Sequence, residues 1–167
     1  TSKGELEFDW VILTAGIGVT ALTTQLQQKI DIRPVLGQAL RFKLEHSLGN
    51  PEFQPVMSGE DVHVIPLGNN EYWLGATVEF PNEVGEVEAN YQLLENLKQA
   101  AIEFYPDLKE AKIIETWSRK RPRPEGIPAP IIEYLSGYNN VLLATGHYRN
   151  GILLAPATAL QVRDMIL

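Results

Sequence analysis

The chain contains no cysteine, which excludes disulfide bonds, thiolate metal sites and cysteine nucleophiles. It lacks the run of about 18 apolar residues that a membrane-spanning helix needs, and no charged-then-apolar signal segment opens it. G-x-S-x-G turns and Walker-type phosphate loops are absent, and His46 has no ligand pair nearby at metal-binding spacing. We therefore expect no metal site and no membrane span, and the lack of cysteine is compatible with the cytoplasmic location that we predict.

Positive charge is also scarce, because 14 Lys and Arg residues face 21 Asp and Glu residues, for a net charge of −7. General nucleic-acid binding depends on neutralising phosphates, so this balance argues against a nucleic-acid partner. Residues 119–123, called the basic segment below, are the exception, with four cations in five residues. Three interpretations remain open: a solvated loop, a carboxylate-binding site, and a nucleic-acid patch that lacks interleaved aromatic residues.

Periodicity and turn residues predict a mixed order of strands and helices. Residues 45–60 show no clear period, and residues 120–130 contain four prolines, so we expect both segments to be loops. Pro156 suits the first position of the last helix. The order indicates an α+β fold with a mixed, mainly antiparallel sheet packed against helices. The predicted strands are 6–13, 36–44, 62–67, 72–80, 112–119 and 141–144, and the predicted helices are 21–30, 86–105 and 156–166.

The most informative stretch is residues 144–159. A buried-strand pattern leads into a polar loop flanked by glycines, and a helix follows. The loop offers backbone N–H groups, His147 and Arg149 where the N-terminus of a helix favours negative charge. This arrangement suits an anion or an electron-rich ring.

This stretch resembles the C-terminal flavin-contacting segment of the FAD-dependent D-amino-acid and glycine oxidases, most closely the glycine oxidases of thiamine biosynthesis. The similarity continues in order through segments 11–16, 34–38, 64–66, 74–77 and 117–122. The N-terminal G-x-G-x-x-G turn of that family, which holds the FAD pyrophosphate, has no counterpart. We therefore expect the chain to be the C-terminal portion of such an oxidase.

The resemblance implies a division into three segments. Residues 1–34 and 121–167 would belong to a Rossmann-like FAD-binding domain, the second segment carrying the flavin-contacting loop and the final helix. Residues 35–120 would form the substrate-binding domain. Apolar surface left uncovered by the missing part predicts a homo-oligomer or association with the missing N-terminal half.

The resemblance also implies a set of substrate-binding residues. Arg121 and Arg149 align with family arginines that hold the substrate carboxylate, a role that suits the two parallel donors of a guanidinium. His63 stands where the family has a tyrosine that assists carboxylate binding. Val78 stands where a methionine can lie beside the substrate side chain.

The cofactor-binding residues follow in the same way. Backbone donors of the flavin-contacting run would face the N1–C2=O edge of the flavin, where negative charge collects on reduction. Amino-acid oxidation by flavin requires orientation of the substrate rather than a reacting side chain, so we predict no catalytic residue. The implied cofactor-binding residues are Gly16, His147, Tyr148, Arg149, Asn150, Gly151, Ile152 and Leu153.

The implied activity is FAD-dependent oxidation of the C–N bond of glycine or a similar small amino acid or amine. Imine and hydrogen peroxide would be the products and oxygen the electron acceptor, whereas the isolated portion should be inactive. Arg119, Gly18 and Glu133 depart from the family pattern. These departures support an alternative, a non-catalytic interaction or scaffold module derived from the same fold.

Overall fold

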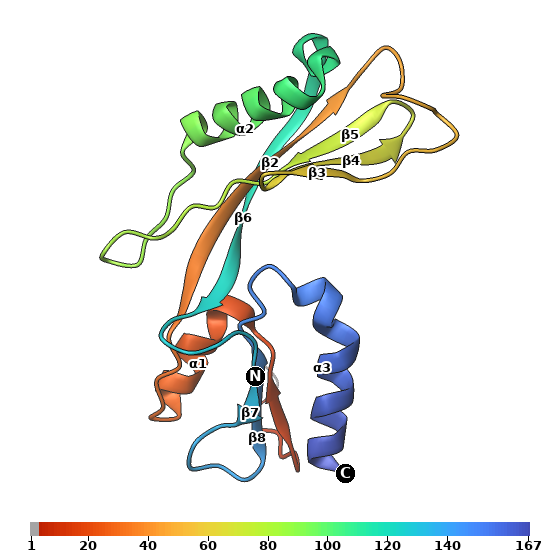
Figure 1. Ribbon diagram of the computed structural model, residues 1–167. Coiled ribbons are helices and arrows are strands. Elements are labelled where there is room, and N and C mark those ends of the chain that lie inside the picture. The colour runs from red at the N-terminus through yellow and green to blue at the C-terminus, as the bar shows by residue number, and fades with distance from the viewer. Residues whose placement is uncertain (1–3) are drawn as a thin grey trace. The chain divides into compact units, whose positions relative to one another are not determined.

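The computed structural model describes residues 4–167 (Figure 1). The chain forms two compact units. Unit 1 contains the residues up to Pro34 together with Arg121–Leu167, and unit 2 contains Val35–Lys120. Two long strands, β2 (Ile32–Lys43) and β6 (Lys112–Pro124), each continue from one unit into the other.

A five-stranded sheet with the order β3-β4-β5-β2-β6 dominates unit 2. β4 (Val62–Gly68) and β5 (Glu71–Gly75) form an antiparallel hairpin, as predicted, although its second strand ends five residues early. Asn69 and Asn70 adopt φ values of 53° and 60° in the turn, which asparagine tolerates. The segment expected to be a loop at 45–60 ends in a short strand, β3 (Met57–Gly59).

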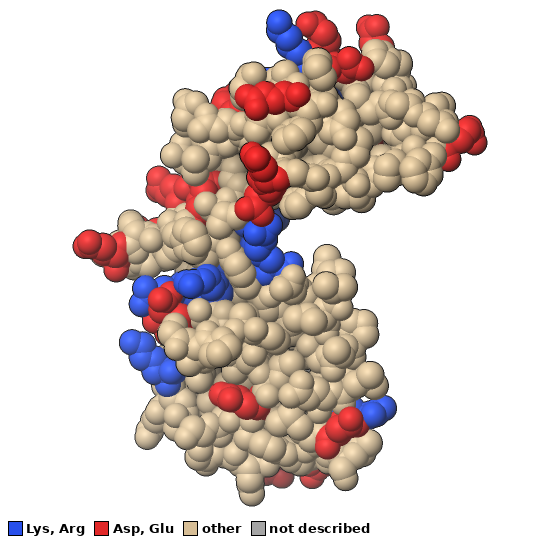
Figure 2. All heavy atoms as spheres, in the orientation of Figure 1, with Lys and Arg blue, Asp and Glu red and all other residues tan. Residues whose placement is uncertain are grey.

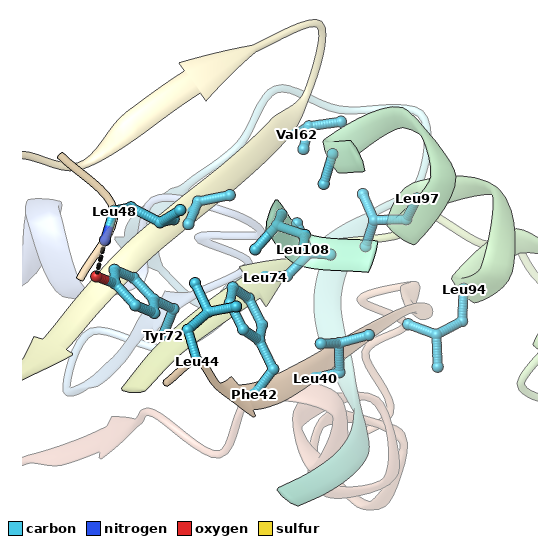
Figure 3. Close-up of a cluster of buried hydrophobic side chains, with 12 residues drawn as sticks. Leu40, Phe42, Leu44, Leu48, Val62, Tyr72, Leu74, Leu94, Leu97 and Leu108 are labelled. Atoms are coloured by element: carbon cyan, nitrogen blue, oxygen red, sulfur yellow. Dashed lines mark hydrogen bonds between the residues drawn. The ribbon is translucent and has the colours of Figure 1, made fainter. Parts of the chain in front are cut away.

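One helix supplies the other layer of unit 2. α2 (Tyr91–Phe104) is followed by the 3₁₀ helix η2 (Pro106–Glu110), and α2 buries Leu94, Leu97 and Ala101. Figure 3 shows leucines of α2 and η2 facing strand residues. The rings of Phe42 and Tyr72 are stacked, with their centroids 5.4 Å apart. These residues form one core: Leu40, Phe42, Leu44, Leu48, Val62, Val64, Tyr72, Leu74, Leu94, Leu97, Ala101 and Leu108.

A three-stranded sheet with the order β1-β8-β7 forms the centre of unit 1. β1 (Val11–Leu13) runs parallel to β8 (Val141–Thr145), whereas β7 (Ile131–Tyr134) is antiparallel to β8. The 3₁₀ helix η1 (Gly16–Gly18) and α1 (Val19–Gln25) follow β1, and α3 (Gly151–Ile166) follows β8. All five residues of β8 are buried.

Several predicted boundaries were wrong at the N-terminal side. The strand expected at 6–13 comprises only β1, and the helix expected at 21–30 is α1, which ends at Gln25. Thr20 Oγ1 donates to Ile30 O at 2.7 Å and accepts from Ile32 N at 3.0 Å. These two bonds hold the irregular segment after α1 against the helix, so that the chain enters β2 beside Thr20. Pro34 lies within β2, because its fixed φ is compatible with extended backbone.

Two helix starts also differ from prediction. α2 begins after Asn90, whose side chain accepts from Gln92 N at 3.0 Å, while Asn82 holds residue 86 in a separate turn. α3 begins at Gly151 rather than at Pro156, which lies inside the helix. Pro156 has no N–H group, so the carbonyl of Ile152 lacks that helical donor; Ile152 itself is 96% exposed.

Two further corrections concern the proline-rich segment. β6 extends through Pro124, so the loop expected at 120–130 begins five residues late. β7 follows this loop and was not predicted.

Over residues 4–167, no helix is long and apolar enough to cross a membrane. Within the same range, no group of three or more His, Asp or Glu side chains is arranged to hold a metal ion.

Candidate functional site

Three segments distant in the sequence meet in unit 1: the turn after β1, the end of β6, and the closing loop, residues 146–150 between β8 and α3. The Tyr148 N–H donates to Pro122 O at 3.1 Å. Arg121 precedes Pro122, and Arg149 follows Tyr148. This one backbone hydrogen bond therefore joins the segments that carry the two predicted carboxylate ligands.

Gly146 makes the closest approach between these segments. A Cβ at this position would lie 2.5 Å from Pro124 Cγ, and the residue adopts φ +69°. Only glycine satisfies both conditions without a shift of the backbone. The start of the closing loop thus packs directly against the end of β6.

Gly16 brings in the third segment. Its carbonyl accepts from Thr145 Oγ1 at 3.4 Å, and a Cβ on it would contact the Pro122 ring at 3.8 Å. Gly16 also has positive φ, +56°. The turn after β1 is therefore fixed against both β8 and the end of β6.

The closing loop ends at the N-terminus of α3. Asn150, the N-cap residue, makes no side-chain capping bond, and the first turn contains no acidic residue. The first N–H groups of a helix have no partner within the helix, and they lie at the positive end of its dipole. Ile152 and Leu153 in this turn are 96% and 78% exposed. This end of α3 can therefore receive an anionic group beside an apolar surface.

His147 connects the closing loop to the body of α3. Its Nε2 lies 2.8 Å from Thr158 Oγ1, so the two side chains form a hydrogen bond. Thr158 was not predicted from the sequence. With α3 starting at Gly151, Thr158 lies two turns along the helix on the same face, a relation hidden while the helix was expected to start at Pro156.

An open cavity of about 800 Å³ runs alongside this region. Its walls are mainly small or apolar side chains of β1, β8 and α3. The lining residues are Ile12, Thr14, Ala144, His147, Gly151, Ala155, Thr158, Ala159, Val162, Arg163, Ile166 and Leu167. Such a surface suits an apolar ligand or polypeptide better than a highly charged one.

The two predicted carboxylate ligands, both in unit 1, differ in exposure, since Arg121 is half-buried and Arg149 is exposed. The other two predicted substrate residues belong to unit 2. His63, on β4, pairs with Ser58 across the sheet, and its Nδ1 lies 2.9 Å from Ser58 Oγ. Val78 follows β5 and is half-buried on the wall of a cavity of about 630 Å³.

Two pKa shifts arise from ion pairs elsewhere in the molecule. A hydrogen bond from Arg33 to Asp31 raises the pKa of the Arg33 guanidinium. A hydrogen bond from Arg41 lowers the pKa of the Glu71 carboxyl.

Comparisons with known proteins show the family to which the chain belongs. Residues 1–165 match the family model described as FAD dependent oxidoreductase. The chain is 33% identical over 168 residues to the glycine oxidase of Pseudomonas putida, covering 99% of this chain and 44% of that protein. It is 34% identical over 168 residues to the bifunctional protein ThiO/ThiG of Trichormus variabilis, covering 99% of this chain and 24% of that protein.

Solved structures show the same similarity. The glycine oxidase of Bacillus cereus superposes with a TM-score of 0.82 at 25% identity, over 99% of this chain and 44% of that one. An FAD-bound L-alpha-glycerophosphate oxidase of Mycoplasma pneumoniae, at 15% identity, shares the fold with a TM-score of 0.76 over 93% of this chain and 42% of that one. The chain thus spans less than half the length of these relatives. It belongs to the family of FAD-dependent oxidoreductases.

Proposed function

We propose that this chain forms the substrate-domain and flavin-contacting portion of an oxidase that acts on the C–N bond of glycine or a similar small amino acid or amine. The products would be an imine and hydrogen peroxide, with oxygen as electron acceptor. The observation that carries the proposal is the hydrogen bond from Tyr148 N to Pro122 O, which joins the segments bearing Arg121 and Arg149. The glycine oxidases among the relatives support the choice of substrate.

The two units receive different roles in this proposal. Unit 1 supplies part of the FAD-binding domain, and unit 2 is the substrate-binding domain, contributing His63 and Val78. A cytoplasmic location stays a prediction.

The N-terminus of α3 has the chemistry that a flavin requires. Negative charge develops on the N1–C2=O edge of a reduced flavin, and first-turn amides without a side-chain cap or a nearby carboxylate can stabilise it. Ile152 and Leu153 offer exposed apolar surface there. Residues 147–153 would hold the ring, with Gly16 fixed nearby.

When bound, FAD supplies the hydride acceptor that no side chain can provide. The residues of this chain hold and orient the substrate. Arg121 and Arg149 would bind its carboxylate, since planar guanidinium groups match a carboxylate with two parallel donors. Fixing the carboxylate sets the direction of the Cα–H bond, which is the main requirement of this chemistry.

Unit 1 has surface that further polypeptide would cover. Among residues 4–167, β1 lies at the edge of its sheet, and Val11 and Ile12 are 41% and 40% exposed although they point to opposite faces. β1 pairs in parallel with β8, and parallel strands are normally covered on both faces of their sheet. We propose that polypeptide equivalent to the unmatched part of the relatives, rather than a second copy of this chain, occupies the edge of β1 and the cavity beside α3. The isolated chain should then bind FAD weakly and be inactive.

The test joins the chain to the part of the Pseudomonas putida glycine oxidase that it does not match, expressed as one polypeptide. We expect purified protein with the visible absorbance of bound flavin, and oxygen uptake with glycine, sarcosine or D-alanine. Absence of flavin from a folded fusion protein would refute the proposal. Bound flavin without oxygen uptake on any of these amines would instead favour the interaction-module alternative.

Arginine variants of the fusion protein test the carboxylate site. Arg121→Met should raise the KM for glycine on the order of a hundred-fold, the cost of losing one charge-assisted pair. Lys120→Met is the matched control, because it removes the same charge one position away, on the opposite face of the strand. Equal effects of the two substitutions would contradict the assignment of Arg121.

A further inference from the structure

Unit 2 contains a buried carboxylate that the proposed chemistry does not use. Glu79 is 6% exposed and lies between Val78, a predicted substrate neighbour, and the irregular segment 80–90 that leads to α2. Burial of a carboxylate is costly unless donors surround it. The arrangement of those donors indicates what this carboxylate does.

Three donors converge on the Glu79 carboxylate. Gln38 Nε2 donates to Oε1 at 2.8 Å, and Thr77 Oγ1 donates to the same oxygen. The backbone N–H of Asn90 donates to Oε2 at 2.7 Å. With both oxygens engaged, Glu79 is poorly suited to take a proton from a substrate or to bind its ammonium group.

The donors are also tied to one another. Gln38 Nε2 donates a second bond to Asn90 O at 2.8 Å, and the Gln38 N–H donates to Thr77 Oγ1 at 2.8 Å. Gln38 and Thr77 are 3% and 7% exposed. The network therefore joins β2, the segment after β5 and the N-cap residue of α2. The bonds among Gln38, Thr77 and Glu79 are buried, so each is strong and its loss is costly, whereas Asn90 lies at the exposed end of the network.

Val78 lies between two residues of this network. Thr77 and Glu79 point inward, so the alternation of an extended segment turns the Val78 side chain outward. Val78 lines the cavity of about 630 Å³, together with Phe80, Asn90 and Leu93. Hydrogen bonds thus hold both chain neighbours of Val78, Thr77 and Glu79. The Glu79 carboxylate also binds the N–H of Asn90, which lines the same cavity.

We infer that Glu79 is a positioning residue that fixes Val78 on the cavity wall and so sets how large a substrate substituent the protein accepts. This inference rests on the proposed function for its substrate, but the anchoring of Val78 is a property of this chain alone. The role is indirect, because it acts through Thr77 and Val78.

The first experiment follows the backbone amide and methyl signals of Val78 by NMR in the 167-residue chain. In Glu79→Gln, one side-chain oxygen becomes an NH₂ group that must face a donor, either Asn90 N–H or Gln38 Nε2. Thr77→Val removes the hydroxyl at nearly constant shape, whereas Thr77→Ser retains it. We expect the Val78 signals to shift or broaden in Glu79→Gln and Thr77→Val and to stay in place in Thr77→Ser. Unchanged Val78 signals in a folded Glu79→Gln protein would overturn the inference.

The second experiment measures kcat/KM for glycine and for D-alanine, which differ by one methyl group, in the flavin-loaded fusion protein. The ratio of the two values should change on the order of five-fold or more in Glu79→Gln and Thr77→Val, because small displacements near a substrate change rates steeply. The double variant should show no more than the larger single effect, since both residues act through one network. Glu103→Gln, which changes an exposed carboxylate of α2 that does not line this cavity, is the matched control.

The outcomes separate the two proposals. A general loss of folded or flavin-bearing protein would lower the kcat/KM values for glycine and D-alanine together and leave their ratio unchanged. If Glu79→Gln displaces the Val78 signals but leaves this ratio unchanged, Glu79 does not set substrate size. If the fusion protein with the native residues oxidises neither amine, the proposed function fails. The Val78 signals then still decide whether Glu79 fixes that residue.

Discussion

The two units of this chain bury their apolar residues in different ways. Unit 2 gathers twelve buried residues into one core between a sheet and a helix. Unit 1 has two smaller clusters, of six and three buried residues, on different sides of β8. Unit 2 contains 14 Asp and Glu against seven Lys and Arg, whereas unit 1 contains seven of each. In Figure 2, the surface over α3 is largely uncharged.

This difference indicates whether each unit can be stable by itself or requires contact with further polypeptide or ligand. A single core beneath a charged surface gives unit 2 the features of a self-sufficient domain. Both units expose large apolar residues, but in unit 1 they lie on β1, at the edge of its sheet, and on α3, where Leu160 is 53% exposed; Leu167, which follows α3, is 97% exposed. Patches of this kind mark sites of association or ligand binding. The comparison can be tested by substitutions in each unit.

The largest effect should come from the core of unit 2. Phe42→Ala removes a ring that is 2% exposed and stacked on Tyr72, and it should destabilise unit 2 by about 3–5 kcal/mol. Ile152→Ala, which truncates a side chain that is 96% exposed in unit 1, should change stability by less than about 0.5 kcal/mol. Urea unfolding followed by tryptophan fluorescence measures both. Similar losses in the two variants would contradict the contrast between the units.

A smaller effect is expected at the contact between the closing loop and β6. Gly146→Ala adds a Cβ 2.5 Å from Pro124 Cγ at positive φ. Overpacking should cost about 1–3 kcal/mol beyond the strain of the left-handed backbone. Gly126→Ala is the control, because this glycine has φ +74° with no heavy atom within 4 Å of the added Cβ. Hydrogen exchange of β8 amides should speed up in the first variant alone, and equal acceleration in both would exclude the steric explanation.

The bond between His147 and Thr158 should contribute less. Thr158→Val removes the hydroxyl and should destabilise the start of α3 by about 1 kcal/mol, the typical net value of a hydrogen bond. Thr158→Ser keeps the hydroxyl and should behave like the native protein. The measurement is exchange of the α3 amides, together with the ¹⁵N shifts of the His147 ring. Native-like exchange in Thr158→Val would show that the bond does not hold the loop.

The smallest effect concerns the surface pair in unit 2. The hydrogen bond from Arg41, with a weaker one from Lys43, keeps the pKa of Glu71 below its ordinary 4.5, against an opposing effect of burial. Because the folded pKa is the lower one, the stabilisation is present above pH 4.5 and is lost as pH falls through the folded value. Glu71→Gln should therefore flatten the decline of melting temperature below that pH, whereas Glu115→Gln, on the exposed part of β6, should not. If the melting temperature of Glu71→Gln declines with falling pH as steeply as that of the native protein, the ion pair does not contribute to destabilisation by acid.

Local signals were sufficient for part of the architecture. The hairpin of β4 and β5 follows from two apolar runs separated by Gly-Asn-Asn, and β8 with its glycine loop follows from a short buried run. The start of α3 could not be predicted, because Asn150 and Gly151 are typical of turns and Pro156 is typical of a first helical position. β7 was missed because it comes directly after a proline-rich loop.

Long-range contacts could not be predicted at all. The fit of Gly146 against Pro124 depends on where β6 ends relative to β8, which no periodicity encodes. The network of Glu79 likewise assembles residues 38, 77, 79 and 90 from separate elements. A buried glutamate in a short extended segment gives no indication of its donors until the sheet is assembled. The roles assigned to Arg121, Arg149, His63 and Val78 stay predictions.

The pairing of β1 with β8 has a consequence for synthesis on the ribosome. Val11 pairs with Val141, so the first strand of unit 1 leaves the exit tunnel long before its neighbour is made. Unit 2 lies entirely between them and can fold first, since domains generally fold as units during translation. Unit 2 would thus fold while the β1 segment is still unpaired. During that period the apolar residues of β1 are exposed and can be bound by chaperones.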